Sequence, residues 1–328
     1  MAEQSHATGP EIEKAARILA DGGLVAFPTE TVYGLGADAT SAEAVTRIFA
    51  AKGRPADHPL IVHIGSRDDL ERFGADVPPE AARLVDAFWP GPLTLIVGRG
   101  SEIVPETTGG RDTVGLRMPD HSVALELLDA FAAIGSGAVA APSANRFGGV
   151  SPTTAAHVAA DLGTEVELIL DGGPCRVGVE STIVELTGPE PVLLRPGGIS
   201  AVELEAVLGR TVLDGRGGRS RASGMLESHY APDAEVILLD GEKPAPVDLG
   251  PDDGLISAGA RPAGAPPVDG RRHWSLPGEA AGYAAGLYAT LRAADAAGVT
   301  RLYVVVPSRG ELLGAVMDRL AKAAVERP

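Results

Sequence analysis

The sequence predicts an α/β protein of two domains joined by a polar linker. Its 328 residues are too many for one typical domain and suit two. Helical and strand-like patterns alternate through the first 210 residues, as they do in α/β folds. The alternation breaks at 211–234, a segment rich in Gly, Ser and Arg, and it resumes at Glu235. We therefore expect domains at 1–210 and 235–328, with 211–234 as the linker.

Apolar residues at helical spacing place the helices of the first domain. Residues 12–20 carry apolar side chains on one face, and the Asp-Gly-Gly that follows ends this helix. Thr40 to Glu43 has the spacing of a capping box and opens a helix that ends near Lys52, because Gly53 and Pro55 forbid its continuation. Further helices are expected at 79–88, 122–132, 154–162 and 200–208.

Short apolar runs between these helices are typical of buried strands. We expect strands at 24–27, 60–64, 93–97, 113–117, 138–141, 166–170, 181–186 and 191–194. In the second domain we expect strands at 235–239, 255–258 and 302–306, a Pro- and Gly-rich loop at 259–270, and helices at about 279–297 and 311–325. This order predicts a parallel sheet of three or four strands.

Composition and charge exclude several classes of protein. No apolar run approaches the roughly 20 residues that span a bilayer, and the N-terminus lacks the apolar core of a secretory signal. We therefore expect a cytoplasmic protein that does not enter membranes. The formal net charge is −16, and the first 234 residues hold 18 basic and 32 acidic side chains. A surface this acidic repels a phosphate backbone, so direct nucleic-acid binding is expected to be weak or absent.

Two clusters of polar residues and glycines follow apolar strands, where α/β proteins usually bind ligands. Residues 28–36 (PTETVYGLG) place threonines, a glutamate and a tyrosine beside two glycines. Residues 141–149 (APSANRFGG) supply a hydroxyl, an amide and two glycines, which suit a phosphate-binding loop. A capped polar turn explains each cluster equally well. The second is not a Walker A loop, and Ser143 lacks the flanking glycines of a serine-hydrolase nucleophile.

Four cations stand at the ends of predicted elements in this acidic domain. Lys52 and Arg54 flank a helix end, Arg117 ends the strand at 113–117, and Arg195 follows the strand at 191–194. Taken singly, each suits a solvated helix end or strand terminus. If they converge, they form a positive pocket for a triphosphate and a carboxylate. We expect Lys52 and Arg54 to be exposed in that pocket and to contribute little to stability.

The histidines and the cysteine show no pattern of metal ligands. His58 and His63 flank an apolar strand, and their spacing from other His or Cys residues matches no common metal site. Cys175 is the only cysteine, which excludes an internal disulfide, and it is interpreted as a buried or loop thiol. We therefore expect no protein-bound metal site.

Taken in order, these segments resemble the YrdC-like domain family. The segments are FPTETVYGLGADA, KGRP, HPLIVHI, FWPGPLTLIV, TVGLRMPDH, AAPSANRFGGVSPT, VESTIVEL and LLRPGGI, between Ile12 and Leu208. The continuation through SGMLESHYAPDAEV is similar to the long, two-domain L-threonylcarbamoyladenylate synthases. The resemblance implies a YrdC-like twisted mixed sheet with flanking helices, and a smaller C-terminal α/β domain with a Rossmann-like parallel sheet.

The resemblance implies a nucleotidyltransferase that uses L-threonine, bicarbonate or CO2, and ATP with Mg2+. Its products would be L-threonylcarbamoyl-AMP and pyrophosphate, and a threonylcarbamoyl-transferase complex would use the adenylate to form threonylcarbamoyladenosine in tRNA. The alternative is a non-catalytic RNA-binding or ribosome-maturation module on the same fold, which the acidic first domain disfavours. A related carbamoyl-adenylate enzyme of hydrogenase maturation needs a cysteine-rich zinc module, which one cysteine cannot supply.

The resemblance also assigns roles to individual residues. The implied catalytic residues are Lys52, Arg54, Ser143 and Asn145. The implied threonine-binding residues are Thr31, His63, Arg117, Ala141 and Ser181, and the implied ATP-binding residues are Arg54, His58, Thr113, Ser143, Ser151, Arg195 and Tyr230. Arg117 is the expected clamp for the α-carboxylate of threonine, and His58 stands where the family motif has asparagine. The Ser-His-Tyr-Ala-Pro segment that contains Tyr230 is expected to be a lid that closes over the nucleotide and excludes water.

Overall fold

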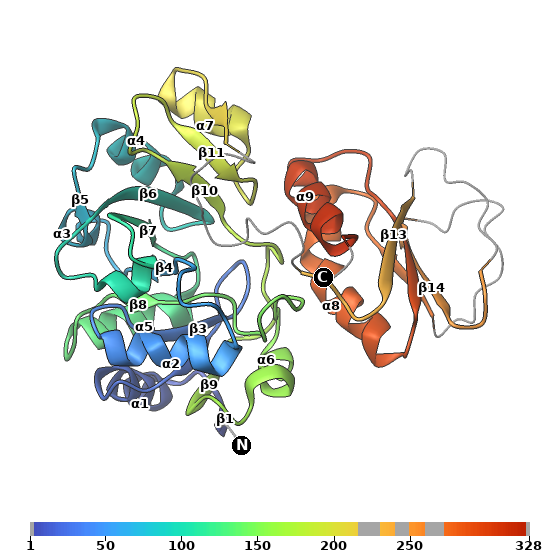
Figure 1. The fold of residues 1–328 in the computed structure, drawn as a ribbon, viewed down its shortest axis with the longest axis horizontal. Coiled ribbons are helices and arrows are strands. Elements are labelled where there is room, and N and C mark those ends of the chain that lie inside the picture. Colours follow the sequence, from blue (N-terminus) through green and yellow to red (C-terminus); the bar gives the residue numbers. More distant parts are fainter. Residues whose placement is uncertain (1–2, 216–229, 240–248, 260–271, 326–328) are drawn as a thin grey trace. The chain divides into compact units, whose positions relative to one another are not determined.

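The computed structural model describes residues 3–215, 230–239, 249–259 and 272–325 (Figure 1). Contacts divide the chain into two compact units. The first comprises Met1–Phe147, Pro152–Arg176 and Glu180–Met225, and the second comprises Gly148–Ser151, Val177–Val179 and Leu226–Pro328. Most of the linker and lid expected at 211–234 lies outside the described residues, as does most of the loop expected at 259–270. Among the described helices, none is long and apolar enough to cross a bilayer.

The first unit is built on one large mixed sheet, as expected. The strand order is β1-β9-β2-β3-β8-β4-β7-β6-β10-β11-β12, and β5 pairs with β6. The strands are β1 (Glu3–His6), β2 (Val25–Phe27), β3 (Gly34–Asp38), β4 (Ile61–His63), β5 (Gly74–Ala75), β6 (Leu93–Arg99), β7 (Thr113–Arg117), β8 (Val139–Ala140), β9 (Leu168–Asp171), β10 (Thr182–Glu185), β11 (Val192–Arg195) and β12 (Leu213–Asp214). Pairs β2/β9, β4/β7 and β6/β10 are parallel, whereas β2/β3, β3/β8, β4/β8 and β6/β7 are antiparallel.

Helices flank both faces of this sheet. They are α1 (Gly9–Ala20), α2 (Ala42–Lys52), α3 (Asp69–Phe73), α4 (Pro79–Phe88), α5 (Ser122–Ala132), α6 (Ala155–Leu162) and α7 (Ala201–Leu208). Successive residues of a strand point to opposite faces. Accordingly, Val25 and Phe27 join a core with α1 and α5, whereas Leu24 and Ala26 join a second core with α2, α4, α6 and α7.

The structure corrects two expectations about local structure in the first unit. Gly34–Asp38 is strand β3, although part of it was expected to be a turn. A Cβ at Gly36 would lie 2.8 Å from the side chain of Val139 and 2.9 Å from that of Phe27. Glycine therefore leaves the space that these two side chains occupy. The capping box expected at Thr40 is absent, because Ser41 caps α2 by accepting from the Ala44 N–H. The Thr40 hydroxyl instead donates to Asp38 Oδ1 at 2.8 Å.

The second unit contains a four-stranded sheet in the order β13-β16-β14-β15. The strands are β13 (Glu235–Leu239), β14 (Asp253–Ala258), β15 (His273–Leu276) and β16 (Arg301–Val305), and every pair is parallel. Helix α8 (Ala280–Ala296) contacts β14 and β15, and α9 (Leu313–Ala323) contacts β13 and α8 (Figure 1). The expected parallel sheet is confirmed, with β15 as the strand that the sequence pattern did not reveal.

Candidate active site

Strand pairing brings three of the sequence motifs together in the first unit. His63 at the end of β4 lies beside Arg117 at the end of β7 and opposite Val139 of β8. Directly after β8, the Ala141 N–H donates to the Ile61 carbonyl at 2.8 Å. The segments HPLIVHI, TVGLR and APSAN are therefore neighbours in the middle of the sheet, although they are far apart in the sequence.

Backbone contacts also join the two polar loops. The Leu35 N–H donates to the Pro142 carbonyl at 2.8 Å, and the Ala144 N–H donates to the Tyr33 carbonyl at 2.9 Å. Within the first loop, the hydroxyls of Thr29 and Thr31 lie 2.8 Å apart, and both residues are fully buried. The threonine-rich loop and the loop with Ser143 therefore form one continuous structure.

Lys52, the last residue of α2, holds the second loop in place. Its Nζ donates to the carbonyls of Ser143 and Asn145, and its side chain is buried. Burial and, to a smaller extent, the charge of Arg54 hold the pKa of Lys52 well below its ordinary value, while Asp161 acts in the opposite direction. Three of the four predicted catalytic residues are thus in direct contact.

Arg54 and His58 face the same aromatic ring. The Arg54 guanidinium carbon lies 5.8 Å from the centroid of the Phe147 ring, and the His58 ring lies 5.5 Å from it at an angle of 60°. Arg54 Nη2 also donates to the Pro59 carbonyl at 3.1 Å. Phe147 was not selected from the sequence, although it stands within the APSANRFGG loop.

Ser181 connects two predicted binding sets. Arg195 donates from Nε to the Ser181 carbonyl at 2.9 Å and from Nη2 to the Ser181 hydroxyl at 3.0 Å. The Ser181 hydroxyl lies 2.8 Å from that of Thr94 on β6. An ATP-binding candidate and a threonine-binding candidate are therefore in contact. Thr94 was missed, and its only signal was a hydroxyl within an apolar strand.

Arg117 is paired with an acid to which the sequence motifs assign no role. Arg117 Nη2 lies 2.7 Å from Glu30 Oε1, and both side chains are at least 95% buried, with exposed fractions of 5% and 1%. Arg117 Nε also donates to the Gly91 carbonyl at 3.3 Å. A buried charge without a partner destabilises the fold. The carboxylate of Glu30 therefore compensates the buried charge of Arg117.

His63 is uncharged at neutral pH. Burial, followed by the nearby charge of Arg117, lowers the pKa of His63 to about 3. The imidazole packs edge-on against Phe27, with 5.9 Å between the ring centroids. It can therefore exchange hydrogen bonds with a ligand without adding charge to the site.

Burial of the four cations contradicts one expectation. Lys52, Arg54, Arg117 and Arg195 are only 2–8% exposed, so they are not solvated pocket residues. Each is held by backbone carbonyls, by a carboxylate or by both, as buried polar groups require. Their substitution is therefore expected to weaken the fold as well as the chemistry.

Three further residues complete the predicted ATP-binding set. Thr113 begins β7, four residues before Arg117, which is about 13 Å along a strand. Ser151 and Tyr230 are buried in the second unit. There the Tyr230 ring stacks on Tyr288 with 5.8 Å between centroids, and the Arg319 guanidinium lies 5.1 Å from its centroid. The nucleotide-binding roles of these three residues stay predictions.

The described residues contain no group of three or more His, Cys, Asp or Glu side chains that could hold a metal ion. Cys175 is buried, and burial followed by the charge of Glu30 raises the pKa of its thiol to about 12. The thiol therefore stays protonated at neutral pH and is a poor nucleophile.

Comparisons with known proteins decide the family. Residues 17–197 match a family described as "Telomere recombination", and residues 199–325 match "Threonylcarbamoyl-AMP synthase, C-terminal domain". The threonylcarbamoyl-AMP synthase of Bacillus subtilis is 41% identical over 329 residues, which cover 96% of this chain and 93% of that protein. The chain belongs to the threonylcarbamoyl-AMP synthase family.

Other members of the threonylcarbamoyl-AMP synthase family agree with this assignment. The Pyrococcus abyssi threonylcarbamoyl-AMP synthase is 51% identical over 239 residues, which cover 71% of this chain and 69% of that protein. A crystal structure of P. abyssi Sua5 complexed with L-threonine matches with a TM-score of 0.87 and 40% identity, covering 99% of this chain and 97% of that chain. The expected fold and enzyme class are confirmed, and nothing in these likenesses favours the RNA-binding alternative.

Proposed function

We propose that this chain is a cytoplasmic enzyme that converts L-threonine, bicarbonate or CO2, and ATP into L-threonylcarbamoyl-AMP and pyrophosphate. Membership of the threonylcarbamoyl-AMP synthase family supports the reaction. The contact of Arg195 with Ser181 carries the proposal for this site, because it joins the predicted nucleotide-binding and threonine-binding sets.

The chemistry brings two anions together. The amine of threonine first takes up CO2 to form a carbamate and releases a proton. A carbamate oxygen then attacks the α-phosphorus of ATP, and the bond to the β-phosphate oxygen breaks as pyrophosphate leaves. Such a reaction depends mainly on positioning and on neutralisation of charge. Mg2+ would reach the site on the phosphates of ATP, since it commonly binds through substrate phosphates and few protein ligands.

The nucleotide half of the site consists of Lys52, Arg54, Ser143, Asn145 and Arg195. In this proposal Lys52 orients the Ser143–Asn145 loop, and the guanidinium groups of Arg54 and Arg195 neutralise phosphate charge. His58 packs against Phe147 beside Arg54, which suits a place beside the nucleotide. Thr113, Ser151 and Tyr230 complete the proposed ATP-binding set.

The threonine half consists of Thr31, His63, Arg117, Ala141 and Ser181. Arg117 binds the α-carboxylate, and the burial of its Glu30 partner holds the guanidinium in one position. The uncharged His63 and the hydroxyls of Thr31 and Ser181 supply hydrogen bonds, and Ala141 contributes its backbone.

The linker and the second domain serve the same reaction in this proposal. Residues 211–234 form a lid over the nucleotide, and residues 235–328 hold its far end. The contacts of the Tyr230 ring with Tyr288 and Arg319 support that anchor. The adenylate passes to a threonylcarbamoyl-transferase complex that acts on tRNA. The acidic first domain supports transfer without direct tRNA binding by this chain.

A product assay tests the proposed function. The protein is mixed with ATP, Mg2+, bicarbonate and L-threonine, and pyrophosphate release is measured together with the mass of the adenylate. We expect both products only when threonine and bicarbonate are present. Pyrophosphate release that ignores threonine would refute the substrate assignment. Arg195→Met should raise the KM for both substrates, because the same guanidinium touches Ser181 and the proposed nucleotide site.

A further inference from the structure

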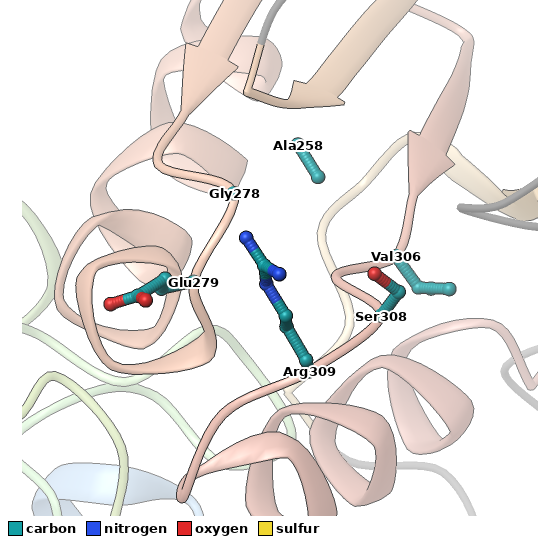
Figure 2. Close-up of a pocket in the computed structure, with 6 residues that line it drawn as sticks. All are labelled: Ala258, Gly278, Glu279, Val306, Ser308 and Arg309. Atoms are coloured by element: carbon teal, nitrogen blue, oxygen red, sulfur yellow. The ribbon is translucent and has the colours of Figure 1, made fainter.

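The second unit contains a pocket of about 410 Å3 that the proposed reaction does not use. It is lined by Ala258, Gly278, Glu279, Val306, Ser308 and Arg309 (Figure 2). These residues lie at or directly after the carboxyl ends of the neighbouring parallel strands β14, β15 and β16. Ligands of open α/β sheets bind outside the carboxyl ends of the strands. The volume lies within the range of roughly 300–1,000 Å3 that is common for small-molecule sites.

Arg309 is the cation of this pocket. Its side chain extends toward the middle of the pocket (Figure 2), and it makes no ion pair within the described part of the chain. Arg272, Arg301 and Arg319 of the same unit are paired with Asp252, Asp253 and Asp318, respectively. An arginine without a carboxylate partner, placed in a concave site, has its charge available for a ligand.

The backbone beside the pocket holds Arg309 in position. Its carbonyl accepts a hydrogen bond of 3.1 Å from the N–H of Ala280, the first residue of α8. Gly310 has a φ of +119°, and a Cβ there would lie 2.9 Å from the Ala280 nitrogen. Only glycine lets the loop pack this closely against the start of α8. The direction of Arg309 therefore depends on a constrained loop.

The other walls leave room for an anion. Gly278 contributes no side chain, and Ala258 and Val306 are apolar. The carboxylate of Glu279 points away from Arg309 (Figure 2), so it does not neutralise the guanidinium. Glu279 also makes no side-chain hydrogen bond to the first turn of α8. The pocket therefore combines one available guanidinium, the hydroxyl of Ser308 and a small apolar surface.

We propose that this pocket binds a small phosphorylated anion, with its phosphoryl group on Arg309. The planar guanidinium matches a phosphoryl group in bidentate fashion, and the Ser308 hydroxyl can donate a further hydrogen bond. The apolar wall of Ala258 and Val306 suits the remainder of a compact ligand. All lining residues belong to the second unit, so the inference goes beyond the proposed reaction and does not depend on it.

NMR titration of the full-length, isotopically labelled protein tests the pocket. Inorganic phosphate, pyrophosphate and AMP are added separately at constant ionic strength, and the amide signals of Gly278 and Ala280 are followed. We expect saturable shifts of both signals with at least one probe. Arg309→Gln should weaken this binding about tenfold or more, which corresponds to ~1.4 kcal/mol. Arg272→Gln, the same substitution at a paired arginine, should leave the dissociation constant unchanged.

The outcomes separate the sources of the phosphoryl group. Equal affinity for inorganic phosphate and AMP would mean that the phosphoryl group alone is recognised, and tighter binding of AMP would assign the apolar wall to the nucleoside. Glu279→Gln should keep or tighten the binding, because it removes a negative charge at the rim. Weaker binding by Glu279→Gln would indicate a cation site and overturn the proposal. The proposal also fails if the shifts are confined to the first unit, or if Arg309→Gln binds as tightly as the unchanged chain.

Discussion

The two units place arginines after the carboxyl ends of their strands in different surroundings. In the first unit, Arg117 and Arg195 end β7 and β11, and both are almost fully buried against Glu30 and Ser181. In the second unit, Arg309 follows β16 and is exposed without an ion pair among the described residues. Buried polar groups need partners, so the arginines of the first site are held within the fold, whereas Arg309 is an exposed side chain of the second unit.

One ion pair from each unit shows the same contrast. Arg117 and Glu30 are 5% and 1% exposed, while Arg301 is 46% exposed beside Asp253. The two tryptophans make this comparison measurable, because Trp89 lies in the first unit and Trp274 lies in the second. In a variant that keeps only one tryptophan, the fluorescence of that residue reports the unfolding of the unit that contains it.

The largest expected effect is that of Lys52→Met on catalysis. Without the ammonium group, the Ser143–Asn145 loop loses two hydrogen bonds, and turnover should fall roughly 100-fold or more. The fluorescence of Trp89 should also report a less stable first unit. The control is Arg72→Gln, which removes a half-exposed ion pair with Glu102 and should keep full turnover. A Lys52→Met protein with normal turnover would contradict the proposed role of this loop.

Breaking the buried ion pair should cost the most stability. Glu30→Gln leaves Arg117 buried without a counter-ion, which typically costs about 3–5 kcal/mol. Asp253→Asn, the matched change in the second unit, should cost much less, since Arg301 can turn to solvent. Urea denaturation of the single-tryptophan proteins measures both changes.

A neutral replacement of the whole pair provides the control for this comparison. The double substitution Glu30→Gln/Arg117→Met removes both buried charges and should recover most of the stability lost in Glu30→Gln. If Glu30→Gln and Asp253→Asn lower the free energy of unfolding equally, burial does not determine how much each ion pair contributes to stability.

The pH dependence of stability should differ between the units below neutral pH. The pKa of His63 is about 3 in the folded state and near 6.5 when exposed, so the unfolded chain binds the proton first as the pH falls. His63 therefore lets the first unit lose stability from about pH 6.5 toward pH 3, by up to ~1.4 kcal/mol per pH unit. His63→Gln should reduce this slope in Trp89 unfolding and leave Trp274 unfolding unchanged. If Trp89 unfolding depends on pH with the same slope before and after His63→Gln, this effect is excluded.

The smallest expected effect comes from helix capping. Ser200 and Glu203 form a complete capping box at α7, so Ser200→Ala should destabilise the first unit by about 1 kcal/mol. Glu279 caps α8 without a side-chain hydrogen bond, and Glu279→Ala should change the second unit by less than about 0.5 kcal/mol. Thermal unfolding followed at each tryptophan separates the two results.

Much of the fold was predictable because its signals are local. Gly53, with a φ of +64°, ends α2 where the sequence indicated, and the apolar runs became strands of the expected sheets. The errors arose where a distant residue decided the outcome. Thr40 does not cap α2, because its hydroxyl donates to Asp38. Gly34–Asp38 is a strand because it pairs with β2 and β8.

The candidate site was predictable in its residue types and incomplete in its contacts. The order of the motifs identified Lys52, Ser143, Arg117 and Ser181 as candidates, and it identified the family. Glu30 and Phe147 lie within the two polar clusters and Thr94 lies in an apolar strand, but the sequence does not show which distant residue each of them contacts. Their importance depends on which strands and loops meet.

By itself, the sequence determined the alternation of elements, the two domains' fold class and the membership of the threonylcarbamoyl-AMP synthase family, because periodicity and motif order are properties of neighbouring residues. Only the tertiary structure decided which charges are buried and which groups they contact. Arg117 meets Glu30, and Arg195 meets Ser181, through packing between distant segments. Burial makes such partners obligatory, since a charge removed from water must be compensated inside the protein.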